Sequence, residues 1–245
     1  MPSMNLLSQL AIALLLLFTS ACRSSKTLSN KGFQRVFDGK TLNGWKGDKK
    51  YWRVENGTIV GEVTPQTLLK QNSFLIWTGA QPGDFELKVD YRISAQGNSG
   101  INYRSIEIDT LPYALKGYQA DIDGKDKYGL GYPRYSGQNY EEKGRQFLAL
   151  RGQKVIIETG GKPRVIDTLG SKESLLKSIN YDNWNELLIV AKGNNIKHFI
   201  NGTLMAEVTD NDTINRRMDG LIGVQVHVGP PMKIEFKNFL LKILK

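Results

Sequence analysis

One ten-residue stretch of this chain alternates strictly between apolar and charged side chains. In residues 84–93 every second position is apolar, and each position between is acidic or basic. Successive side chains of a β-strand point to opposite faces, so the pattern predicts a strand with one buried and one hydrated face. Such a strand is typical of an antiparallel sheet.

Turn signals separate many other short apolar stretches. Residues 51–60 predict a hairpin closed by Asn56-Gly57, the strongest short hairpin signal. Residues 146–150 and 154–158 are expected to form a second hairpin, and residues 171–179 the single helix. Short strands at this spacing with so little helix predict an all-β fold, an antiparallel β-sandwich of jelly-roll type.

The N-terminus has the features of an export signal. An apolar run at residues 10–18 is too short to span a membrane and is followed by small residues and Cys22, the only cysteine. This resembles a bacterial lipobox and predicts a lipoprotein signal peptide (1–22), a lipid anchor at Cys22, a tether (23–32) and one domain (33–245). The expected location is the cell envelope, membrane-anchored on the periplasmic or outer-membrane side. Residues 1–22 contain no Lys or Arg, so a fortuitous apolar N-terminus is the alternative.

The net charge of +9 says little about partners. Lysines and arginines are spread singly over the expected strands rather than clustered with aromatic residues, so we expect no nucleic-acid partner. Attraction to an anionic envelope surface explains the charge better.

Two stretches reserve one strand face for polar side chains. In residues 117–124, Gln119, Asp121 and Asp123 share one face, while Ala120 and Ile122 point into a core. A hydrated outer face is the alternative interpretation of this strand taken alone.

The second stretch, residues 221–228, places Gln225 and His227 on one face and valines on the other. Two such strands favour a common polar cleft, although a structural histidine is the alternative at 227.

The other histidine, His198, lies beside a turn, where we expect a surface role. Arg104 either holds a ligand oxygen or pairs with a carboxylate across the sheet.

Several chemistries are excluded by motif. The chain has no nucleophilic cysteine in its mature part, no Gly-rich phosphate loop before a helix, and no paired-histidine or paired-cysteine metal motif.

Residues 125–144 form a long expected loop with four tyrosines. These rings either stack on sugars or pack the loop on itself.

Seven short motifs in order resemble the 3-keto-disaccharide hydrolase family over residues 33–244. They are Phe37-Asp38-Gly39-Lys40 with Gly44-Trp45, Trp52-x-Val54-x-x-Gly57, Gly83 to Leu87, Gly97 to Ile101, Gly117 to Ile122, Trp184-Asn185 with Asn201-Gly202, and Gly223 to His227. The resemblance implies a concanavalin A-like jelly roll and cleavage of glycosides already oxidised to a ketone at C3. That ketone acidifies the C2 hydrogen, so a base forms an enolate that expels the C1 substituent, and water then adds to the product. Such a site needs a base with a pKa near neutrality, a donor for the enolate oxygen and an acid for the leaving group.

On this basis we assign roles to the polar residues. His227 is the expected general base or acid, Asp121 its carboxylate partner or the alternative base, and Arg104 the group that steadies the enolate. The residues expected to bind substrate are Gln119, Asp123, Gln225, Tyr118 and, at the rim, Asn98. A divalent metal held by Asp121, Asp123 and His227 is an open possibility.

The chain departs from the family pattern at two positions. Many family members carry Glu where this chain has Gln119 and Gln where it has Asp121, so the acidic and amide roles are exchanged here.

Two other functions are alternatives to this reaction. A non-catalytic carbohydrate-binding or surface-assembly module is the competing class, because the same sandwich serves lectins. A conventional glycosidase is disfavoured, because the Glu-x-Asp-x-x-Glu strand of laminarinase-type enzymes is absent.

Overall fold

The computed structural model describes residues 31–245, of which Gly32–Lys245 form one compact unit. The expected signal peptide (1–22), Cys22 and most of the tether (23–32) lie outside the described residues. Within residues 31–245, no helix is both long and apolar enough to cross a membrane.

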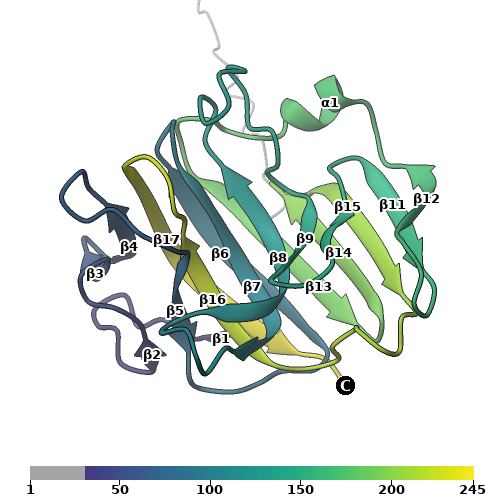
Figure 1. Cartoon of the computed structure of the whole chain (residues 1–245), viewed down its shortest axis with the longest axis horizontal. Helices are drawn as coiled ribbons and strands as arrows, with labels where there is room; N and C mark the ends of the chain where they lie inside the picture. The colour runs from purple at the N-terminus through teal and green to yellow at the C-terminus, as the bar shows by residue number, and fades with distance from the viewer. Residues whose placement is uncertain (1–30) are drawn as a thin grey trace, which may run out of the picture. The chain divides into compact units, whose positions relative to one another are not determined.

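The unit consists of two sheets. The larger has ten strands, with β1 (Gln34–Arg35) paired to β17 and the others in this spatial order: β12 (Arg164–Thr168), β11 (Gln153–Ile157), β15 (Thr203–Asp210), β14 (Asn195–Ile200), β13 (Asn185–Lys192), β6 (Phe85–Ile93), β17 (Met232–Ile243), β4 (Thr58–Val63) and β3 (Trp52–Glu55). Figure 1 shows β11 and β12 at one edge of the unit and β3 and β4 at the other. In the described part of the chain, β11 and β15 are the one parallel pair.

The smaller sheet has seven strands and carries the candidate site. Its order is β10 (Gln146–Ala149), β9 (Asn139–Glu142), β8 (Leu115–Asp123), β7 (Asn98–Glu107), β16 (Leu221–Val226), β5 (Ser73–Trp77) and β2 (Trp45–Lys46). All of its pairings are antiparallel. The expected all-β antiparallel sandwich is therefore confirmed.

The core lies between the sheets and follows the alternation in the sequence. All five apolar residues of β6 are buried: Phe85, Leu87, Val89, Tyr91 and Ile93. Burying such a side chain contributes about 1.5–3 kcal/mol, and a one-residue slip of register would turn all five toward water. On the other face Lys88 is also buried, because its ammonium lies 4.9 Å from the centroid of the Phe33 ring.

The prediction that residues 146–150 and 154–158 pair as a hairpin is wrong. β10 pairs with β9 in the smaller sheet, whereas β11 pairs with β12 and β15 in the larger one. The chain therefore crosses between the layers at Leu150–Gly152. Gly152 has a φ of 92°, which makes this a tight turn, and a turn signal does not say whether the strands that it joins are paired.

Two further expectations change in detail. The helix α1 is shorter than expected, Lys172–Leu176, with Ser171 as its N-cap, whose side chain accepts a hydrogen bond from the Ser174 backbone. The long expected loop (125–144) contains the strand β9.

Candidate active site

The strand β8 provides the floor of the site on the outer face of the smaller sheet. Gln119, Asp121 and Asp123 lie on that face as the sequence predicted, and Asp121 is opposite Gly100 on β7. A Cβ atom at Gly100 would lie 2.5 Å from Cδ of Gln119, so only glycine leaves room for that side chain. Gln119 donates from Nε2 to Oδ1 of Asp121 at 2.6 Å and accepts from Gln225 Nε2 at 3.2 Å.

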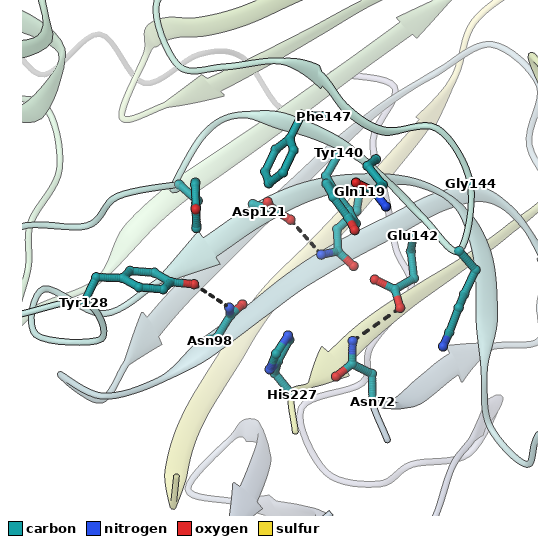
Figure 2. A pocket seen from close by; sticks show the side chains of 13 residues that line it. Asn72, Asn98, Gln119, Asp121, Tyr128, Tyr140, Glu142, Gly144, Phe147 and His227 are labelled. Carbon is teal, nitrogen blue, oxygen red and sulfur yellow. Dashed lines mark hydrogen bonds between the residues drawn. The ribbon is translucent and has the colours of Figure 1, made fainter. Parts of the chain in front are cut away.

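A cavity of about 450 Å³ opens over this floor (Figure 2). Four of the predicted site residues line it: Asn98, Gln119, Asp121 and His227. The other side chains lining it come from loops, β9, the β9–β10 turn and β10: Asn72, Tyr128, Tyr135, Tyr140, Glu142, Lys143, Gln146 and Phe147, with the backbone of Gly144.

The carboxyl of Asp121 has the perturbed acidity that acid–base catalysis requires. Burial raises its pKa to about 7, and the charges of Asp123 and Glu142 act in the same direction. Amide hydrogen bonds from Gln119 and Gln138 oppose this, because each favours the charged form. Each oxygen keeps a second lone pair, so Asp121 can hold a proton while both amides stay bonded.

His227 is half-buried at the cavity wall with one ring nitrogen engaged. Nδ1 is bonded to the carbonyl oxygen of Val228, and a carbonyl only accepts, so Nδ1 carries the proton. Nε2 therefore has the free lone pair. Burial and then the charge of Lys127 lower the pKa of His227, while the Val228 bond raises it, so the imidazole is neutral near pH 7.

Glu142 is a site residue that the sequence did not reveal. Burial raises its pKa, and it accepts a hydrogen bond from Asn72 Nδ2 at 3.3 Å (Figure 2). It belongs to β9, a four-residue strand inside the expected loop. Four residues are too few for an alternation of polar and apolar side chains to be recognised. The one signal in the sequence was the pair of adjacent acidic residues, Glu141-Glu142.

Arg104 does not line the cavity, which corrects its expected role at the enolate. The guanidinium is buried and donates to the carbonyl oxygens of Gly83 and Gly193 at 2.8–3.0 Å, and it pairs with Asp84 at 3.1 Å. Arg104 has a φ of 46° at an irregularity in the pairing of β7, which redirects its side chain away from the outer face. The alternative role, an ion pair, is the one observed.

Two residues expected to bind substrate have structural partners instead. Tyr118 lies on the inner face of β8, stacks on Tyr103 at 5.7 Å and donates to Asp210 at 2.6 Å. Asp123 accepts hydrogen bonds from the backbone amides of residues 134–136 and from the Ser136 hydroxyl. Its carboxylate therefore anchors the loop that forms one wall of the cavity.

The remaining predicted residues differ in how directly they reach the cavity. Asn98 lines it and donates to the Tyr128 hydroxyl at 3.4 Å (Figure 2). Gln225 is fully buried behind Gln119, and its Oε1 has no protein partner. His198 is not at the surface as expected. It is buried in the core between the Tyr103 hydroxyl and the Gln138 carbonyl.

The three candidate metal ligands do not converge. Asp123 is occupied by the loop amides, the oxygens of Asp121 each accept an amide, and no group of three or more His, Cys, Asp or Glu side chains in residues 31–245 is arranged to hold an ion. These three side chains therefore do not fit a shared metal ion.

The tyrosines of the long loop both line the cavity and pack on one another. Tyr128 and Tyr135 meet edge to face at 5.1 Å, and Phe147 contacts both Tyr135 and Tyr140. Tyr132 lies outside this cavity, in an adjacent one. The packing of the loop on itself is therefore observed, and stacking of these rings on a sugar stays a prediction.

Comparison with known proteins decides the family. The model of the 3-keto-alpha-glucoside-1,2-lyase-like domain matches residues 32–242. The chain belongs to this family. A 3-keto-disaccharide hydrolase of Bacteroides thetaiotaomicron is 32% identical over 102 residues, which cover 39% of this chain and 32% of that protein. This chain thus matches about a third of the length of that relative.

Similar solved structures confirm that this chain has a jelly-roll fold. A putative glycosyl hydrolase from Parabacteroides distasonis superposes with a TM-score of 0.55 at 23% identity, covering 87% of this chain and 94% of that one. The β-glucanase of Bacillus licheniformis superposes with a TM-score of 0.50 at 12% identity, covering 89% and 100%. At these identities the likeness shows the fold alone.

Proposed function

We propose that this protein cleaves glycosides oxidised to a ketone at C3, by elimination and hydration. The observation that carries the proposal is one polar cavity that holds both a neutral imidazole with a free Nε2, His227, and a carboxyl with a pKa of about 7, Asp121. Membership of the 3-keto-alpha-glucoside-1,2-lyase-like family supports the choice of substrate.

In the first step His227 acts as the base. Its Nε2 takes the C2 proton, which the C3 ketone acidifies, and the bonding electrons move onto the C3 oxygen. Lys143 is the cationic side chain that lines the cavity within the described residues, and it is suited to stabilise the enolate that Arg104 cannot reach.

In the second step Asp121 acts as the acid. The enolate re-forms the ketone, a C1–C2 double bond forms, and the C1–O bond breaks with its electron pair on the leaving oxygen. Protonated Asp121 gives that oxygen its proton. Water then adds across the double bond, so the net result is hydrolysis. Asn72, Asn98 and Gln119 provide amides for the sugar hydroxyls.

Removal of the base tests these roles. We expect His227→Ala to lower kcat/KM on a 3-keto-glucoside by roughly 10²–10⁴-fold, the usual contribution of a positioned base. The thermal melt should stay nearly unchanged, because His227 lies at a cavity wall rather than in the core. Added imidazole should restore part of the activity. Undiminished turnover, or a loss explained by unfolding, would contradict the assignment.

The pair Asp121 and Glu142 favours one second candidate, a conventional glycosidase with two carboxyls. In that mechanism both carboxyls are indispensable and unoxidised glycosides are substrates. Elimination instead assigns proton transfer to His227 and Asp121, so Glu142→Gln should retain most turnover of the keto substrate. Equal loss in Asp121→Asn and Glu142→Gln would support the glycosidase.

We further propose that the enzyme is held in the cell envelope through lipid on Cys22. The apolar run and the small residues before this cysteine support the proposal. A Cys22→Ala protein should appear in the soluble fraction of the producing bacterium, whereas the unaltered protein should partition with membranes.

A further inference from the structure

A second cavity adjoins the candidate active site. It measures about 740 Å³ and shares Tyr135 and Phe147 with the first cavity. Its other walls come from the long loop, the crossover between β10 and β11, and the edge strand β12. The two cavities therefore meet at a pair of aromatic rings, and a ligand seated in the first can extend into the second.

The free surface of the second cavity is more apolar than polar. Four exposed apolar side chains line it: Leu130, Phe147, Leu150 and Val165, which are 43–50% exposed. Single exposed apolar residues are normal on a protein surface, but several gathered around one hollow indicate a binding site.

The three cationic side chains of this cavity make contacts within the protein. Arg151 donates to the carbonyl oxygens of Ser136 and Pro133 at 2.9 and 3.0 Å. Lys172 bonds the Tyr132 hydroxyl, and the Arg134 guanidinium lies 4.9 Å from the centroid of the Tyr135 ring. In contrast to the first cavity, no carboxyl is among the described residues that line this one, and the amide of its Gln138 donates to Asp121.

We propose that the second cavity is the leaving-group subsite and that it binds an aromatic aglycone. The proposal rests on the proposed function, in which the first cavity holds the oxidised sugar. The flat ring lies against Tyr135 and Phe147 and extends toward Leu130 and Val165. When the C1–O bond breaks, the aryl oxygen leaves with the electron pair and takes the proton from Asp121. A phenol has a pKa of about 10, so it leaves more readily than an alcohol of a second sugar.

Two exposed residues of one edge strand provide the test. Val165 lines the cavity, whereas its neighbour Ile166, 45% exposed, does not. We would measure kcat/KM for a phenyl and a methyl 3-keto-glucoside. We expect Val165→Asp to lower the phenyl-over-methyl ratio roughly tenfold, because a charge replaces an apolar contact with the ring. Ile166→Asp should leave the ratio unchanged. The same ratio in all three proteins would overturn the proposal.

A binding measurement separates this inference from the proposed reaction. Calorimetry with the unoxidised phenyl and methyl glucosides requires no chemistry. Tighter binding of the phenyl compound that Val165→Asp abolishes and Ile166→Asp preserves would support the subsite even if no keto substrate is cleaved. Turnover of keto substrates with no preference for the phenyl group in either assay would overturn the subsite and leave the proposed function intact.

Discussion

At the residue scale, the acidity of Asp121 is set by opposing effects. Burial disfavours its charge, and the side-chain amides of Gln119 and Gln138 favour it. Gln119 lies two residues before Asp121 on β8, and its amide donates to the carboxyl at 2.6 Å.

The proposed roles predict a bell-shaped pH dependence of kcat/KM. His227 must be neutral, so activity rises with pH through its pKa, which lies below 6.5. Asp121 must be protonated, so activity falls as the pH rises through about 7. Initial rates between pH 4.5 and 9 measure both limbs. Activity that keeps rising above pH 8 would contradict Asp121 as the acid.

Gln138 provides a sharper test of the same carboxyl. Gln138→Met keeps the size of this buried side chain but removes the amide that favours charged Asp121. The pKa of Asp121 should rise, and the basic limb of the pH profile should move to higher pH. If Gln138 only supported the fold, the rate would fall at every pH without any displacement of that limb.

At the element scale, short strands determine what the sequence reveals about the site. The polar face of β8 was predictable, because nine residues are enough for alternation to be seen. β9 was not, although it brings Tyr140 and Glu142 to the cavity. The position of Arg104 was not predictable either, since a single left-handed residue in β7 redirects its side chain without any signal in the pattern.

His198 on β14 connects the two sheets and makes folding sensitive to acid. Its Nδ1 donates to the Gln138 carbonyl and its Nε2 accepts from the Tyr103 hydroxyl on β7, at 2.7 Å. Burial lowers its pKa from 6.5 to about 4. Between these values the unfolded chain binds the proton and the folded chain does not. Stability is therefore full above pH 6.5 and falls as the pH drops toward 4, by roughly 3 kcal/mol in total.

A variant isolates this contribution. His198→Gln can keep one donor and one acceptor in the same place but does not titrate. Its free energy of unfolding should fall less steeply than that of the unaltered protein between pH 6.5 and 4.5, as measured by urea unfolding. Parallel slopes would show that His198 is not the source of the acid sensitivity.

At the scale of the whole molecule, local sequence patterns were enough to predict the fold class. They predicted the residues of the candidate site only in part. Alternation and turn signals were enough for two antiparallel layers, because each strand must bury one face. They did not place β10 and β11 in different sheets, because pairing across the molecule depends on contacts far apart in sequence. Gln119, Asp121, Asn98 and His227 meet as expected because they lie on or beside neighbouring strands of one sheet face.

The distinction between elimination and ordinary hydrolysis rests on the C3 ketone of the substrate. We would incubate residues 23–245 with a 3-keto-glucoside and with its unoxidised parent, with and without a chelator, and follow release of the aglycone. We expect release from the keto compound alone, and the incubation with chelator decides whether an ion is required. Release from both compounds would indicate a conventional glycosidase, and release from neither a binding module; either result would contradict the proposed elimination.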